Sequence, residues 1–375
     1  MNGSRIQLAR LDSIQYLRFF AAGLVVAAHC YAMVPRVGRG DLGSSFDIGA
    51  SGVDIFFAIS GFIMLLITET HEQSPSDFIL HRVARVAPIY WVMTAVMSLV
   101  LVVDPAVFYA SKFSAPAFVA SLFFFPWPHA TLTGAWPILT VGWTLNYEFL
   151  FYILFAAGLS VNYDRRAALT IAMLLILVAC GFAFQPTGVR ARFYTSPLLL
   201  EFVFGILIAR LYIASKLPGL RFSIALVTLG VISLLIMIHF PVERLSPWRP
   251  IVWGVPAAIT VLGAVGIEVA GRVPHIKVLR ALGDASYSIY LTHLFSLGAV
   301  RVIWSRLRLG SVVSDVFLLG FGAAFAFLIG YIVYLFLERP LVTVAQRIRA
   351  NLVQLFIDKP KQPNESLKRQ RQPAR

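Results

Sequence analysis

The segment YLRFFAAGLVVAAHC, Tyr16 to Cys30, begins like a membrane-crossing helix, yet it contains an arginine and a histidine. Arg18 and His29 are eleven residues apart, which is about three turns of an α-helix. Both side chains therefore project from one face, about 16 Å apart along the axis. Ionisable side chains within membrane spans are costly and commonly functional. We expect both to line one internal cavity. The alternative is that Arg18 reaches the aqueous surface while His29 bonds a neighbouring helix.

The composition of the whole chain indicates a membrane protein. Of its 375 residues, 58% are hydrophobic and 13% are charged, about half the charged fraction of a soluble domain. Apolar segments recur without the alternation of a β-barrel, and both cysteines lie within such segments. We predict an all-α polytopic membrane protein with about ten transmembrane helices plus one short re-entrant or interfacial segment, residues 118–127. The predicted spans are residues 13–34, 51–69, 87–104, 138–160, 167–184, 196–214, 222–240, 250–269, 285–304 and 314–338.

Charged residues outside the spans indicate the orientation. Lys and Arg are nearly balanced between the loops of the two sides, and the basic C-terminal tail decides for cytoplasmic N- and C-termini. We expect a cytoplasmic N-terminus over residues 1–12, a transmembrane domain over 13–340 and a basic, disordered cytoplasmic tail over 341–375. The net charge of +14 is then explained by loops and a tail that face anionic lipid headgroups, not by nucleic acid.

Further ionisable side chains fall within the predicted spans. Asp54 either caps the start of its helix or pairs with a buried cation or histidine. Glu148 stands one turn before Tyr152, which can donate a hydrogen bond to it. Glu201 also falls within a predicted span, but its sequence context indicates a function only weakly. Arg82 and Arg85 lie on one face of a short amphipathic segment, as ordinary positive-inside residues or as a clamp for phosphate.

Aromatic and polar side chains also recur at helical spacing. Trp143 precedes Tyr147 by one turn, which is typical of a binding site or of an interfacial aromatic belt. Tyr287, Tyr290 and His293 recur every three residues and form a polar ridge, either in a site or as hydrogen bonds between helices. The sequence contains no HExxH or CxxC motif, so we expect no metal site.

These segments, taken in order, resemble the membrane-bound acyltransferase-3 family, and most of all its exopolysaccharide-modifying, ExoZ-like O-acyltransferases. Together the matching motifs extend over nearly the whole membrane domain. They are the arginine and histidine of the first span, GVDIFFAISGF (Gly52 to Phe62), HRVARVAPIY (His81 to Tyr90), GWTLNYEFLFY (Gly142 to Tyr152), SYSIYLTHL (Ser286 to Leu294) and ERP (Glu338 to Pro340).

The resemblance implies an enzyme that moves an acyl group, usually acetyl, from acyl-CoA to a sugar hydroxyl of an exopolysaccharide or other cell-surface glycan. It implies a bacterial inner-membrane location and acyl-CoA as co-substrate. The expected partners are a glycan or lipid-linked oligosaccharide acceptor, membrane lipid and the machinery of polysaccharide synthesis, with no nucleic acid.

The resemblance also implies that Arg18 and His29 are essential and that Arg82 and Arg85 form a basic motif. We expect His29 to act as the general base and Glu148 to orient it or to hold the sugar. The three arginines are expected to bind the phosphates of acyl-CoA. Direct transfer and a histidine-linked acyl intermediate both remain open. The low-ranked substrate or oxyanion candidates are Asp54, Trp143, Tyr152, Tyr287, Tyr290 and His293.

A second class of protein fits the same pattern. A proton-coupled transporter or exporter of a glycan or lipid-linked sugar would also have about ten spans with buried charges. The lack of a visible internal repeat and the Arg82/Arg85 pair favour the transferase. A structural subunit of a polysaccharide synthase is the third possibility.

Overall fold

A computed structural model of the chain describes residues 11–33, 47–70, 73–104, 112–129, 134–237, 247–307 and 315–357. Within these ranges the chain is helical, apart from one isolated antiparallel bridge between Pro128 and Ala135. The α-helices are α1 (Asp12–Tyr31), α2 (Ser51–Thr70), α3 (Pro75–Val103), α4 (Ala115–Leu122), α5 (Trp143–Gly158), α6 (Tyr163–Phe184), α7 (Val189–Tyr194), α8 (Leu199–Ile213), α9 (Leu220–Ile236), α10 (Val255–Val269), α11 (Lys277–Asp284), α12 (Ser286–Arg306), α13 (Asp315–Val333) and α14 (Arg339–Ile357).

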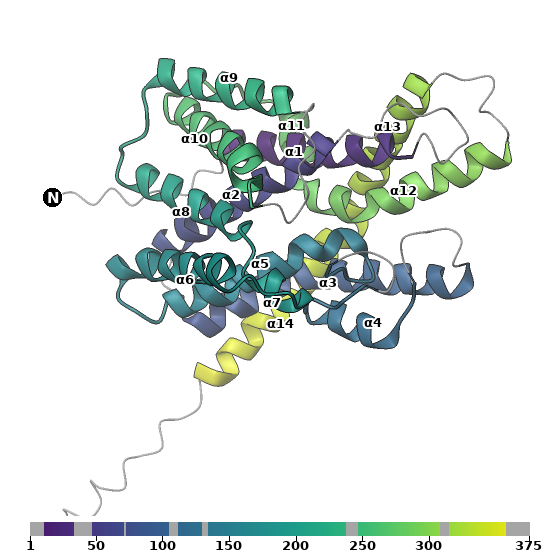
Figure 1. Cartoon of the computed structure of the whole chain (residues 1–375), viewed down its shortest axis with the longest axis horizontal. Coiled ribbons are helices and arrows are strands. Elements are labelled where there is room, and N and C mark those ends of the chain that lie inside the picture. Colours follow the sequence, from purple (N-terminus) through teal and green to yellow (C-terminus); the bar gives the residue numbers. More distant parts are fainter. Residues whose placement is uncertain are drawn as a thin grey trace, which may run out of the picture.

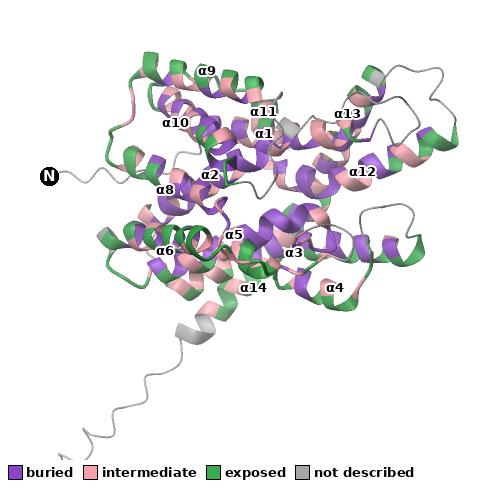
Figure 2. Cartoon of the chain, in the orientation of Figure 1, coloured by how far each residue is buried: buried purple, intermediate pink, exposed green. Residues whose placement is uncertain are grey.

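The helices form two groups whose axes run mostly along the long dimension of the molecule (Figure 1). One group contains α1, α2 and α8–α13, and the other contains α3–α7. The segment that leads from α13 into α14 passes from the first group to the second. Buried residues concentrate on α1, α2, α5 and α8, while the outward faces of α6 and α9 are exposed (Figure 2). Exposed apolar faces of this kind suit contact with lipid.

The helices agree with the predicted class, but the count of ten spans is not confirmed. Each predicted span coincides with a helix, and seven helical segments among the described residues are long and apolar enough to cross a membrane. Helices α5 and α9 have 16 and 17 residues, fewer than the roughly 20 that a span requires. Helix α12 has 21 residues but carries many hydroxyl and charged side chains, and it is not among the seven.

The segment predicted to be re-entrant or interfacial, residues 118–127, contains the end of a short helix and the chain that follows it. Helix α4 has eight residues, a length of about 12 Å, and extended chain follows it. Trp91 of α3 donates a hydrogen bond from Nε1 to the carbonyl of Leu122, 2.8 Å away, and so fixes the end of α4.

Helix α3 is longer than predicted. It begins at Pro75, where the Ser74 hydroxyl accepts a hydrogen bond from the Asp77 N–H (3.1 Å), and it has 29 residues. Pro88, which the sequence placed at the start of a span, lies inside this helix. Membrane helices tolerate proline because neighbouring groups satisfy the freed carbonyl. A helix of about 44 Å exceeds the hydrocarbon thickness, so its first turns extend beyond the span.

The first part of the tail predicted over residues 341–375 is helical. Helix α14 continues to Ile357, and residues beyond it lie outside the described part of the chain. Gln346 donates from Nε2 to the carbonyl of His81 (3.3 Å), and Arg349 pairs with Asp77 at 3.0 Å. These contacts stabilise α14 against the first turns of α3, a partner that composition alone does not reveal.

Helices α2 and α8 approach closely through glycines. A Cβ on Gly205 would lie 2.1 Å from the carbonyl oxygen of Ala58, and one on Gly61 would lie 2.2 Å from that of Phe202. Small residues at such crossings allow the backbones to pack directly, which is a main source of helix association in lipid.

We expect Gly205→Ala to destabilise the protein, because the new methyl group has to displace backbone, at a typical cost of about 1–3 kcal/mol. The measurement is the thermal unfolding midpoint of detergent-solubilised protein. Gly320→Ala in α13 is the matched control, since a Cβ there meets nothing within 4 Å. Equal midpoints for the two variants would contradict close packing between α2 and α8.

Candidate functional site

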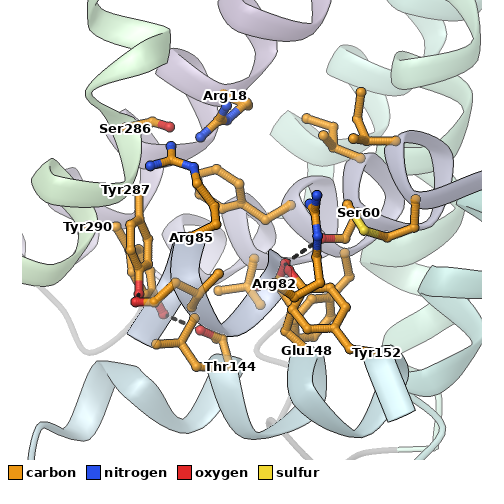
Figure 3. A pocket seen from close by; sticks show the side chains of 18 of the residues that line it. Arg18, Ser60, Arg82, Arg85, Thr144, Glu148, Tyr152, Ser286, Tyr287 and Tyr290 are labelled. Atoms are coloured by element: carbon orange, nitrogen blue, oxygen red, sulfur yellow. Dashed lines mark hydrogen bonds between the residues drawn. The ribbon is translucent and has the colours of Figure 1, made fainter. Parts of the chain in front are cut away.

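A cavity of about 260 Å³ lies between the two groups of helices. Helices α1, α2 and α12 form one side, and α3 and α5 form the other (Figure 3). Its volume is slightly below the range of roughly 300–1,000 Å³ for small-molecule sites, so it suits part of a large ligand. The polar residues that line it are Gln15, Arg18, Ser60, Arg82, Arg85, Thr144, Glu148, Tyr152, Ser286, Tyr287 and Tyr290.

Three arginines give this cavity a positive character. Arg18 comes from the second turn of α1, and Arg82 and Arg85 come from adjacent turns of α3, as the sequence predicted. Arg18 lies beside Ser286 at one end of the view, with Arg85 next to it (Figure 3). Glu148 is the one carboxylate among the lining residues, so cations outnumber anions three to one. Guanidinium groups gathered in this way favour a phosphate or carboxylate ligand.

A buried carboxylate holds Arg85 in place. The Nη1 atom of Arg85 lies 2.6 Å from Oε1 of Glu338, whose side chain is fully buried, while 34% of the Arg85 side chain is exposed. The hydroxyl of Ser288 donates to the other carboxylate oxygen, 2.6 Å away. Glu338 ends the π-helical turn Tyr334–Glu338 between α13 and α14. The sequence indicated only the end of a helix at Glu338. It did not indicate that this carboxylate pairs with Arg85.

Glu148 lies in the cavity, not beside His29. Its Oε1 atom accepts hydrogen bonds from Ser60, at 2.7 Å, and from the Tyr152 hydroxyl. Arg82 is almost buried and lies 5.7 Å from the ring centre of Phe78. The expected pair Glu148 and Tyr152 is therefore present, and Ser60 joins it.

The hydroxyl protons of Tyr287 and Tyr290 are committed to backbone carbonyls. Tyr287 donates to Val86 and Tyr290 donates to Val141, each at 2.8 Å. Thr144 lies 3.0 Å from the Tyr290 oxygen. Either tyrosine would have to release its carbonyl before it could donate to an oxyanion.

The structure corrects the expectation that Arg18 and His29 line one cavity. Both face α12, but His29 is not among the residues that line the cavity, and its ring lies against that of His293. The rings of His293 and Tyr290 are 6.0 Å apart, and Tyr290 does line the cavity. Arg18 and His29 are about 16 Å apart along α1, and Arg18 alone of the two lines this cavity.

Asp54 and Trp143 also lie outside the cavity wall. Asp54 is fully buried and pairs with Arg249, whose Nη2 and Nε atoms lie 2.7 and 3.2 Å from its two oxygens. The sequence placed Arg249 in an outer loop and gave no sign of this pairing. Trp143 packs edge-on against the rings of Phe57 and Tyr147. Both residues stabilise the helix packing around the cavity.

In the part of the chain that the structure describes, no three His, Cys, Asp or Glu side chains are placed to hold a metal ion. The polar side chains that line the cavity carry guanidinium, carboxylate, amide and hydroxyl groups. This set is suited to binding an anionic ligand that also carries groups able to form hydrogen bonds.

Comparison with known proteins places this geometry in a family. The sequence matches the acyltransferase domain family over residues 11–338. It is 35% identical to the exopolysaccharide production protein ExoZ of Rhizobium meliloti (strain 1021) over 315 residues, which cover 83% of this chain and 95% of that protein. It is 30% identical to nodulation protein 10 of Rhizobium leguminosarum bv. viciae over 181 residues, 43% of this chain and 48% of that protein. No solved structure matches the chain. The chain belongs to the acyltransferase 3 family, the one that its motifs resemble.

Proposed function

We propose that the protein is an integral membrane O-acyltransferase that moves an acyl group, most often acetyl, from acyl-CoA to a sugar hydroxyl of an exopolysaccharide or other cell-surface glycan. Membership of the acyltransferase family supports the reaction class. Similarity to a protein of exopolysaccharide production supports a glycan acceptor. The observation that carries the proposal is the cavity into which Arg18, Arg82 and Arg85 project.

The cavity suits the phosphate-bearing part of acyl-CoA. Each of the three guanidiniums can form charge-assisted hydrogen bonds to phosphate oxygens. With the predicted cytoplasmic N-terminus, Arg18 lies near the inner surface, on the side where acyl-CoA is made. Beyond the arginines the wall becomes apolar and aromatic, with Val53, Phe56 and Leu145, which suits the acyl-bearing arm of the donor.

His29 has the tautomer that a general base needs. Its Nδ1 atom lies 2.9 Å from the carbonyl oxygen of Val25, which can only accept, so Nδ1 carries the proton and Nε2 the lone pair. The sugar oxygen attacks the thioester carbonyl carbon and the carbon–sulfur bond breaks. The hydroxyl proton goes to Nε2 and then to the departing thiolate. For this step the donor arm has to extend past Tyr290 to reach His29, and Glu148, which lies in the cavity, is placed beside the donor.

The transporter alternative makes a different prediction about CoA. A transporter moves its cargo without breaking a thioester, whereas the transferase releases one free CoA for each acyl group moved. Family membership supports transfer. A structural subunit of a synthase would release no CoA either.

We expect purified protein in lipid vesicles to release CoA from acetyl-CoA when a bacterial exopolysaccharide acceptor is added, and His29→Ala to reduce this rate by about 10²–10⁴. The measurement is free thiol over time, with acetylated sugar detected by mass spectrometry. Cys30→Ala is the matched control, since Cys30 is buried on the same helix and contributes nothing to the proposed step. Full activity of His29→Ala would exclude His29 as the general base.

We expect Arg18→Gln to lower kcat/KM for acetyl-CoA about tenfold or more, because a charge-assisted hydrogen bond to phosphate is worth roughly 1.5–3 kcal/mol. With acetyl-pantetheine, which has no phosphate, the variant and the natural protein should be equal within about twofold. Arg18→Lys keeps the charge and is the conservative control. An equal loss with both donors would show that Arg18 does not recognise phosphate.

A further inference from the structure

We infer that His293 is a positioning residue for His29, and that the two imidazoles share one proton during acyl transfer. The inference rests on the proposed role of His29 as the base. His293 lies on α12, one turn beyond Tyr290, and is not itself among the residues that line the cavity. Its ring contacts Tyr290, whose hydroxyl is bonded to the carbonyl of Val141, and His29, the proposed base. We therefore assign its effect on the reaction to the contact with His29.

The two rings are in direct contact. Their centroids are 4.8 Å apart and their planes meet at 63°, an edge-to-face arrangement that leaves no room for other atoms between them. His293 is fully buried, and His29 is partly buried. A proton on one ring therefore lies within the electrostatic reach of the other, in surroundings with little water to screen it.

Both rings have their Nδ1 atoms occupied in the same way. Nδ1 of His29 is bonded to the carbonyl of Val25, and Nδ1 of His293 is bonded to the carbonyl of Tyr290 at 2.7 Å. Since carbonyls only accept, each ring carries its proton on Nδ1 and its lone pair on Nε2. In the neutral form, both rings therefore have Nε2 as their basic nitrogen.

The basic nitrogen of His293 is not satisfied by the helices around it. Nε2 of His293 has no hydrogen-bond partner among the described residues, and leaving a buried acceptor unpaired costs about 1–3 kcal/mol. The nearby hydroxyl groups are already committed. Thr292 donates to the carbonyl of Ser288, and Ser296 donates to that of Thr292. The neighbouring face of α13, around Gly322, is apolar, and Cys30 packs there.

A proton gained by His29 gives this lone pair a partner. When the acceptor hydroxyl loses its proton to Nε2 of His29, the cation that forms can share that proton with Nε2 of His293. The same proton then returns through His29 to the sulfur of the departing thiolate, so the pair is unchanged after each turnover. A second proton is opposed by repulsion between two buried cations, so the pair holds one.

The test compares two substitutions of nearly equal length. Glutamine at position 293 has an amide oxygen that can accept a hydrogen bond, and methionine does not. We expect His293→Met to lower kcat at least tenfold while KM for acetyl-CoA stays within twofold, and His293→Gln to retain at least a third of kcat. Rates are expressed per mole of monodisperse protein in lipid vesicles, and His293→Phe replaces the methionine variant if that one folds poorly.

Trp304→Phe is the control on the same helix. It removes another buried nitrogen that lacks a hydrogen-bond partner among the described residues, about three helical turns beyond His293, and should leave kcat unchanged. The inference is wrong if His293→Met keeps the natural kcat, or if the methionine and glutamine variants lose activity equally. An inactive His29→Ala beside a fully active His293→Met overturns only this inference. An active His29→Ala overturns the proposed base itself.

Discussion

The ion pair between Arg85 and Glu338 joins the two groups of helices at the point where the cavity lies between them. Glu338 has no exposure and Arg85 is one-third exposed, so the carboxylate is fixed in the interior and the guanidinium is held at the cavity wall. Removing Arg85 would leave the Glu338 carboxylate unpaired in surroundings of low dielectric, and breaking a buried pair in this way typically costs about 3–5 kcal/mol. The π-helical turn that ends at Glu338 gives the carboxylate this position, between α13 and the helix that packs on α3.

Two other buried arginines are also paired with carboxylates inside the protein. This pairing distinguishes them from arginines that could bind a ligand. Arg249 pairs with Asp54 and lies 4.8 Å from the ring centre of Trp253, while Arg166 pairs with Glu69 at 2.6 Å. The positive charges of Arg249 and Arg166 are therefore compensated within the protein. Three guanidiniums project into the cavity, and the carboxylates in reach of them are Glu148 in the wall and Glu338, which pairs with Arg85, so an excess of positive charge remains. Such an excess favours an anionic ligand.

The arrangement of α12 links this cavity to the histidine pair. Tyr290 lines the cavity and bonds the turn before α5, and His293 lies one helical turn further along against His29. The arginine-lined cavity and the histidine pair are therefore neighbours along one helix, and Tyr290, whose hydroxyl donates to the carbonyl of Val141, lies between them.

The sequence by itself determined the helical membrane class, the short segment near residue 120 and the family. It also singled out Arg18, Arg82, Arg85 and Glu148 as candidate site residues, because the length of an apolar segment and the cost of an ion within it are local properties. Only the tertiary structure decided that His29 lies outside the cavity, that Glu338 holds Arg85, and that Asp54 belongs to Arg249. Those pairings join residues about 200 or more apart in the chain, and helical periodicity gives a side chain's face but not the helix that it meets.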